Sequence, residues 1–421
     1  MKLVADLLGS PAILVGLVAC LGLIVQRKRP GDVLVGTIKT VTGVLILFAG
    51  AGAIVGALLY LTPMVQQAFG VEGLVPNNEA FVALAMAKAG GLVAWVMLGG
   101  FVVNLILARV TPWKFVFLSG HHILYVSVLL VLFMDAANLS TWTIIVIGSL
   151  VSGFLYVLLP ALTKGQMSEV TNGQPIAMGH FGASGYFLAG LMGKWFGDKR
   201  TSTEDMNVPD SWQFLKETVA LTSVVVTILF VILALLVGPQ YIVETLNVEQ
   251  HWVVFAIMQG LWFGAGLAVV ITGVRMMLAE IVPAFHGIAA RIVPGALPAL
   301  DCPVVFPFAP NAVLLGFVCS TLAGIATTVI MKWAGGILVV PPMIQHFFMG
   351  GTAAVFGNAT GGRRGAIIGA CLNGVLFTVL PVLLWPFTKV VLAEPITYGD
   401  PDFCWTGMAV GAVLRWLNLI P

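Results

Sequence analysis

Long apolar runs fill most of this chain and leave few positions where charged side chains could meet water. Eleven such runs fall roughly at residues 10–26, 37–60, 82–108, 115–135, 139–160, 218–238, 252–281, 312–332, 335–358, 364–392 and 405–421. About 20 apolar residues suffice for a helix to cross the hydrocarbon core of a bilayer. Only 9% of the 421 residues are charged, whereas soluble domains carry about 25%, so lipid must cover much of the surface. The pattern predicts an all-α membrane protein with about eleven transmembrane helices.

The few charges indicate how the chain is oriented. The formal net charge of +2 gives no indication of a nucleic-acid partner. Basic residues gather at Arg27–Arg29 after the first run and at Lys194, Lys199 and Arg200, close to or within the long polar stretch at 193–217. The positive-inside rule places both groups in the cytoplasm. In a bacterial inner membrane we therefore expect the N-terminus outside and, with eleven spans, the C-terminus in the cytoplasm.

Three short patterns occur once in each half of the chain, in the same order. They are Gly-x-x-Pro-x-x-acid at 73–79 and 295–301, Thr-Gly-Val starting at Thr42 and Thr272, and Phe-x-x-Gly starting at Phe117 and Phe347. Three ordered matches predict two structural repeats. An odd number of spans between corresponding points would invert the second repeat relative to the first, as in many transporters.

These matches also predict how the chain is divided. Repeat one covers approximately 10–180, a cytoplasmic amphipathic loop covers approximately 193–217, and repeat two covers approximately 218–421. The Gly and Pro residues at 73–79 and 295–301 predict re-entrant or interrupted helices. Such backbone at membrane depth is tolerated only where it is buried in protein or lines a cavity. We therefore expect the substrate site beside these two segments.

Two carboxylates are the first candidate binding groups. Glu79 and Asp301 occupy matching positions in the two repeats. A carboxylate inside the membrane is costly unless it is paired or hydrated, so a functional role is the default hypothesis. A carboxylate also accepts hydrogen bonds from the hydroxyl groups of a polar substrate. The alternative, which is compatible with binding, is that each carboxylate caps a half-helix.

Histidines are the second set of candidates. His121 and His122 follow Leu118-Ser-Gly, and His180 lies in Met-Gly-His-Phe. Imidazole can donate and accept hydrogen bonds at once, which suits hydroxyl or enolate oxygens. We expect His121 and His180 in the site, with a purely structural role open for each, and a structural role for His122. The other three histidines are expected at surfaces or interfaces: His251, His286 and His346.

No pattern predicts a metal, a cofactor or a catalytic residue. The sequence has no H-x-x-x-H pair and no C-x-x-C pair, so we expect no zinc site and no disulfide framework among its five cysteines. It also has no Walker motif, which excludes ATP hydrolysis by that machinery. The chemistry that the sequence favours is the binding and transport of a small polar solute.

Several stretches resemble a known transporter family. They include Gly36-Thr-Ile-Lys-Thr-Val-Thr-Gly43, Pro76-Asn-Asn-Glu79, Leu118-Ser-Gly-His121, Gly179-His180, Asp301-Cys302, Phe308-Ala-Pro-Asn311 and Gly361-Gly-Arg363. The chain is similar over nearly its whole length to the ascorbate-type enzyme IIC permease of the bacterial phosphotransferase system. The resemblance implies a homodimer with eleven spans per subunit in two inverted repeats. It also implies a dimerising scaffold and a mobile core that carries the substrate in an elevator-like movement.

The resemblance also implies site residues. They are Asn78, Glu79, His121, His180 and Asp301, to which we add Tyr125 and Phe181 at two places where some members carry Gln. Those two departures affect which sugar or sugar acid is bound.

The resemblance further implies that a separate cytoplasmic IIB protein, supplied by IIA, delivers the phosphoryl group to the substrate. The main alternative is a proton-coupled secondary transporter that uses Glu79 or Asp301 as its proton carrier. A membrane-embedded enzyme is a third class, for which the sequence shows no catalytic constellation.

Overall fold

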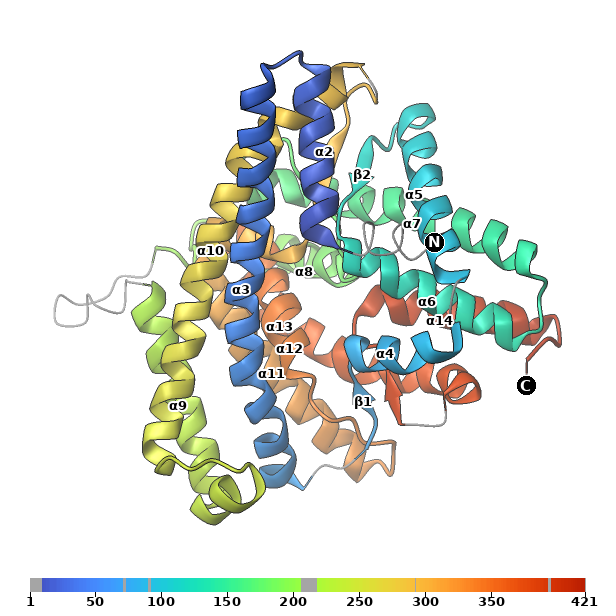
Figure 1. Cartoon of the computed structure of the whole chain (residues 1–421). Coiled ribbons are helices and arrows are strands. Elements are labelled where there is room, and N and C mark those ends of the chain that lie inside the picture. The colour runs from blue at the N-terminus through green and yellow to red at the C-terminus, as the bar shows by residue number, and fades with distance from the viewer. Residues whose placement is uncertain are drawn as a thin grey trace.

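The computed structural model describes residues 10–420 except 71–72, 90–91, 206–217, 292 and 393–394, and the side chains of some helical residues, Glu79 among them, lie outside the description. Most of the described chain is helical (Figure 1). The helical elements are α2 (Pro11–Val25), α3 (Pro30–Phe69), α4 (Asn78–Ala89), α5 (Leu92–Val110), α6 (Gly120–Ala136), α7 (Thr141–Val170), α8 (Ala183–Phe196), α9 (Thr218–Val237), η2 (Tyr241–Thr245), α10 (Trp252–Arg291), η3 (Cys302–Phe308), α11 (Pro310–Trp333), α12 (Met343–Gln345), η4 (His346–Gly350), α13 (Gly351–Val391) and α14 (Pro401–Trp416). The strands are β1 (Val75–Pro76), β2 (Phe115–Phe117), β3 (Ala177–Met178), β4 (Leu297–Leu300) and β5 (Ile396–Thr397).

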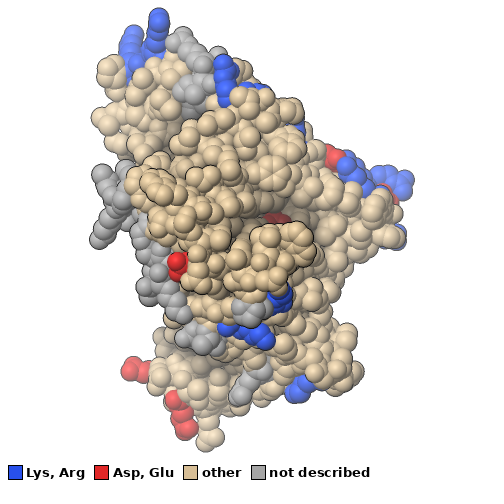
Figure 2. Space-filling view, turned by 90° about the vertical axis from the view of Figure 1, so that its right-hand side faces the viewer, with Lys and Arg blue, Asp and Glu red and all other residues tan. Residues whose placement is uncertain are grey.

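The helices confirm the all-α membrane class, while the number of eleven spans stays a prediction. Within the described ranges, six helices are long and apolar enough to cross a membrane, and three more apolar helices are shorter. One face of the molecule carries few charged side chains over its middle (Figure 2). The runs expected at 335–358 and 364–392 form one helical segment, because α12, η4 and α13 follow one another without a loop. That segment is broken at Gly361 and Gly362, where Gly362 has a φ of 60°.

The two longest single helices other than α13 lie side by side along most of their length. These helices, α3 and α10, contain 40 residues each and have one internal proline each, Pro63 and Pro283 (Figure 1). The two Thr-Gly-Val patterns meet where the helices touch. A Cβ on Gly43 would lie 2.7 Å from Met277 N, and a Cβ on Gly273 would lie 2.3 Å from Leu47 N. This reciprocal contact supports the hypothesis of two repeats, and it requires glycine on both helices.

Gly273→Ala is expected to destabilise the protein because its methyl group would collide with the backbone of α3. Overpacking of this kind costs about 1–3 kcal/mol. The matched control is Gly52→Ala on α3, where an added Cβ meets nothing within 4 Å. The midpoint of thermal unfolding in detergent should fall for Gly273→Ala and stay level or rise for Gly52→Ala. Equal midpoints in the two variants would contradict this packing.

The two Gly-x-x-Pro-x-x-acid segments interrupt the helices, as their glycines and prolines predict, and each contains a short strand, β1 in the first and β4 in the second. β4 lies between β2 and β3 in a parallel three-stranded sheet. β1 pairs in parallel with β5, and a parallel bridge joins Leu74 to Val339 on its other side. Each segment is therefore the middle of a small parallel arrangement that satisfies its backbone hydrogen bonds inside the protein. The two Phe-x-x-Gly patterns do not lie in equivalent structures, because Phe117 ends β2 whereas Phe347 lies in η4.

The first part of the predicted polar loop is anchored to helix ends. Lys194 belongs to the last turn of α8, and residues 197–205 are non-helical. The guanidinium of Arg363, next to the break in α13, donates to the carbonyl oxygens of Ser202 and Asp205 at 2.8 and 2.7 Å. Glu204 accepts the N–H of Ala312 in the first turn of α11 at 3.2 Å, and burial raises the pKa of that carboxyl. Residues 206–217 lie outside the described chain.

Candidate functional site

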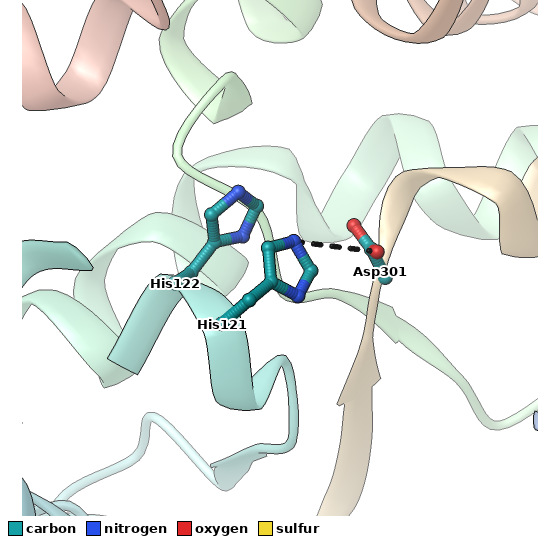
Figure 3. A group of neighbouring side chains, drawn as sticks. All are labelled: His121, His122 and Asp301. Atoms are coloured by element: carbon teal, nitrogen blue, oxygen red, sulfur yellow. Dashed lines mark ion pairs between the residues drawn. The ribbon is translucent and has the colours of Figure 1, made fainter. Parts of the chain in front are cut away.

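Three of the predicted site residues converge because the strands before them are parallel. Asp301 follows β4 directly, His180 follows β3 by two residues, and His121 begins α6 shortly after β2. The carboxyl ends of parallel strands meet at one edge of a sheet, so these side chains come together although they are far apart in sequence. Figure 3 shows His121 on α6 facing Asp301 at the end of β4. Asp301 also caps η3, since its Oδ1 accepts the N–H of Cys302 at 2.7 Å.

The second small sheet brings another group of polar side chains to the same place. Asn78 follows β1 and Asp400 follows β5, and these two strands are parallel. The amide nitrogen of Asn78 donates to Asp400 Oδ1 at 2.5 Å, while its Oδ1 accepts the N–H of Gly399 at 2.9 Å. Gln345 also forms a hydrogen bond with Asp400. Asp400 is only 3% exposed, and Asn78 holds it in position through both ends of its amide.

Three imidazoles face the two carboxylates at a common distance. His121 Nε2 lies 3.6 Å from Asp301 Oδ2, and His180 Nε2 lies 3.6 Å from Asp301 Oδ1. His122 Nε2 lies 3.6 Å from Asp400 Oδ2. This separation exceeds the range of good N–H···O hydrogen bonds, about 2.7–3.2 Å. The groups are therefore close enough to share a bridging hydroxyl group or water, and their direct contacts are weak.

These polar groups open onto a cavity of about 280 Å³. Its polar lining comes from Asn78, His121, His122, Tyr125, His180, Asp301, Cys302, Gln345 and Asp400. The opposite wall is apolar and belongs to α3, which contributes Leu47, Phe48, Ala51 and Val55. The cavity thus lies between the small sheets and α3. A polar solute held here would contact the sheet side by hydrogen bonds and the α3 side by packing alone.

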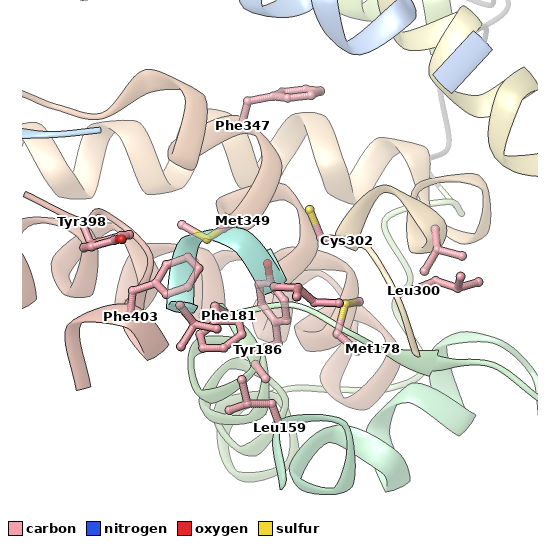
Figure 4. Packing of buried hydrophobic residues seen from close by; sticks show 14 of the residues in the cluster. Leu159, Met178, Phe181, Tyr186, Leu300, Cys302, Phe347, Met349, Tyr398 and Phe403 are labelled. Carbon is pink, nitrogen blue, oxygen red and sulfur yellow. The ribbon is translucent and has the colours of Figure 1, made fainter. Parts of the chain in front are cut away.

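Of the remaining predicted site residues, Phe181 does not line the cavity, Tyr125 does, and the side chain of Glu79 lies outside the description. The ring of Phe181 is fully buried and stacks on Phe403, with centroids 4.3 Å apart, so it packs behind the site instead of lining it (Figure 4). Tyr125 does line the cavity, with its ring edge-on to His121 at 5.7 Å. Glu79 lies in the first turn of α4, and its side chain is outside the described residues.

Sequence reasoning missed Asp400 and Gln345 and undervalued His122. No sequence pattern singled out Asp400, because only the parallel pairing of β5 with β1 brings it to the cavity. His122 needed the structure, since only the fold brings its ring opposite Asp400. The expectation for His346 was wrong: this residue is fully buried, and neither ring nitrogen has a hydrogen-bond partner among the described residues.

The spacing of these groups would also accommodate a metal ion, but their hydrogen bonds do not favour one. Three overlapping groups have ligand atoms within 4.8 Å of one another, and His180 belongs to two of them. His180 Nδ1 accepts the N–H of Gly182 at 2.8 Å, so a neutral ring carries its proton on Nε2, where a metal would need a lone pair. The remaining group consists of His121, His122 and Asp301, and in it His122 directs Nε2 at Asp400 rather than at Asp301. We therefore interpret the cluster as hydrogen-bonding groups. All five cysteines are free.

Comparison with known proteins identifies two relationships. The profile of the EIIC-GAT family, described as PTS system sugar-specific permease component, matches residues 6–412. The "Ascorbate-specific PTS system EIIC component" of Mycoplasma pneumoniae (strain ATCC 29342 / M129) is 26% identical over 419 residues. That alignment covers 86% of this chain and 63% of the relative, so the chain spans less than two thirds of the length of that protein.

Proposed function

Because the chain belongs to the EIIC-GAT family of PTS sugar-specific permease components, we propose that it binds ascorbate or a related sugar acid or sugar and carries it across the bacterial inner membrane. On this proposal a separate IIB protein phosphorylates the substrate on the cytoplasmic side. The observation that carries the proposal is the convergence of His121, His180, Asp301 and Asp400 on one cavity. The name of the Mycoplasma relative favours ascorbate within this class.

The chemistry of the cavity suits a compact molecule rich in hydroxyl groups. Carboxylate oxygens of Asp301 accept hydrogen bonds from hydroxyl groups, and the Nε2–H of His180 donates one. A hydroxyl oxygen placed between an imidazole and a carboxylate 3.6 Å apart can accept from one and donate to the other. This pairing repeats around the cavity and would orient a polyhydroxylated ring.

The two walls of the cavity support an elevator-like movement. The polar wall belongs to the elements that follow the small sheets, whereas the wall from α3 has only apolar side chains among its described lining residues. A polar core can slide along an apolar wall without breaking hydrogen bonds to it. We therefore propose that α3 and α10 belong to a scaffold, which pairs with a second copy in a homodimer, and that the sheets and the helices after them move with the substrate.

The orientation and the partners follow from the same proposal. The basic side chains of Arg27–Arg29, Lys199 and Arg200 would face the cytoplasm, the side from which IIB approaches and on which IIA supplies it. Phosphorylation adds about −1.5 to −2 charges to the substrate at neutral pH. Beside the carboxylates of Asp301 and Asp400 that charge is repelled, which favours release into the cytoplasm.

Asp301→Asn is expected to weaken the binding of ascorbate by roughly 10- to 150-fold, because a hydrogen bond to a charged group contributes about 1.5–3 kcal/mol. The amide keeps one acceptor oxygen, so the lower end of this range is expected. Asparagine is also a good helix cap, which preserves the start of η3. Titration calorimetry on the purified protein measures the change directly.

The matched control for this variant is Asp135→Asn, which neutralises an exposed carboxylate on α6, the helix that carries His121. Its affinity should equal that of the unmodified protein. If Asp301→Asn bound ascorbate as tightly as this control, Asp301 would be a helix cap only, and the binding site would lie elsewhere. If the unmodified protein bound no ascorbate while binding another sugar, the substrate assignment would be overturned.

A further inference from the structure

The cavity contains negative charge that no basic side chain balances. Asp301 and Asp400 both line it, and no Lys or Arg occurs among its described lining residues. The other ionisable lining groups are three imidazoles, Tyr125 and Cys302, and the wall formed by α3 is apolar. With neutral imidazoles and ionised carboxyl groups, the cavity carries a net negative charge. Such a cavity suits a neutral polyol and opposes an anion.

Ascorbate does not match such a cavity by charge, because its enediol is acidic and the molecule is an anion at neutral pH. Enclosing this anion beside two carboxylates is unfavourable unless a positive charge enters the cavity with it. A proton taken up by an imidazole of the lining supplies this charge, whereas a proton taken up by a carboxyl group of the lining removes part of the repulsion instead.

The surroundings of the three imidazoles decide which ring takes the proton. His180 Nδ1 already accepts the N–H of Gly182 at 2.8 Å and lies 3.1 Å from the hydroxyl of Tyr186, so a second ring proton would meet a donor. His122 is only 2% exposed and points at Asp400. His121 is different, because 28% of its side chain is exposed and its Nε2 lies 3.6 Å from Asp301 Oδ2.

Ionisable groups from several elements surround His121. Asp301 and Cys302 face it from the junction of β4 and η3, and His180 approaches from the loop before α8. His122 and Tyr125 are its neighbours on α6, with ring centroids 4.1 and 5.7 Å away. Asp400 lies across the cavity, and α3 contributes apolar side chains only. An imidazolium here would have Asp301 on one side and the anionic substrate in the cavity.

We infer that the protein binds an acidic substrate together with one proton, which is taken from water by His121 beside Asp301. The inference rests on the proposed function, since it concerns how that same site accepts an acid of the ascorbate type. No bond in the substrate changes in this step: the ring nitrogen of His121 gains the proton, and the buffer loses it. A neutral sugar bound in the same cavity would take up no proton.

Calorimetry of ascorbate binding in two buffers with different ionisation enthalpies counts the protons. The unmodified protein should take up about one proton per ascorbate, and its affinity should fall by up to about tenfold per pH unit above the range in which imidazole titrates. His121→Gln keeps a donor and an acceptor but cannot be charged, so its proton uptake should be close to zero. His251→Gln is the matched control, since it removes an exposed histidine that does not line the cavity and should leave the proton count unchanged.

The outcomes separate this inference from the proposed function. Ascorbate binding with no proton uptake by the unmodified protein would overturn the inference and leave the proposed function standing, and this measurement decides even if His121→Gln does not fold. Full proton uptake in folded His121→Gln would overturn the assignment to His121. Absence of ascorbate binding at every pH would overturn the proposed substrate and the inference together.

Discussion

Joining α3 to the wall of the cavity that faces it is expected to abolish transport while leaving substrate binding almost unchanged. Val55 of α3 and Ile344 of α12 both line the cavity, and both side chains are partly buried and apolar. Replacing both with cysteine in a background without the five native cysteines allows a short bifunctional thiol reagent to bridge them. Because neither side chain offers a hydrogen bond to a polar solute, the polar wall and its affinity should survive. Only a movement between the two walls would be blocked.

Uptake into vesicles and calorimetric binding, measured on the same preparation, give the two readouts. Each single-cysteine variant treated with the reagent is the control for modification alone, and it should transport normally. A reducible bridge adds a second control, since transport should return when the bridge is cleaved. Full transport by the bridged protein would show that α3 and α12 do not move apart, and the elevator-like movement would have to be abandoned.

Local sequence chemistry was enough to predict the membrane class and several polar residues that line the cavity. Apolar runs determine where helices form, because a lipid-exposed backbone must satisfy its own hydrogen bonds. Glycine and proline in 73–79 and 295–301 determine where helices are interrupted, and the structure has extended strands there. Asp301, His121 and His180 stood out because polar groups are rare in such surroundings, and all three line the cavity.

The remaining features depend on contacts between distant segments. Asp400 reaches the site only because β5 is parallel to β1, and the sequence around it does not reveal that pairing. Phe181 follows His180 directly, but the chain turns into α8 there and directs the ring into the core against Phe403. The number of spans was equally hard to predict, because the break in α13 depends on residues 197–205 packing at Gly361 and Gly362.

Phosphorylation of the substrate by a partner protein separates a PTS permease from an ordinary transporter. The described cavity offers binding groups, and we propose that IIB supplies the phosphoryl group. A permease of this kind should therefore deliver phosphorylated product and no free substrate. A secondary transporter driven by protons would instead concentrate the free substrate without IIB, and an uncoupler would stop it.

The most direct measurement uses membrane vesicles that contain this protein, with labelled ascorbate outside and phosphoenolpyruvate and purified phosphocarrier proteins inside. We expect phosphorylated ascorbate to accumulate inside only when IIB is present, and to fall to background when IIB alone is left out. Asp301→Asn vesicles should show a reduced rate at low ascorbate concentration, and Asp135→Asn vesicles should match the unmodified protein. Accumulation of free, unmodified ascorbate in vesicles without IIB would contradict the account.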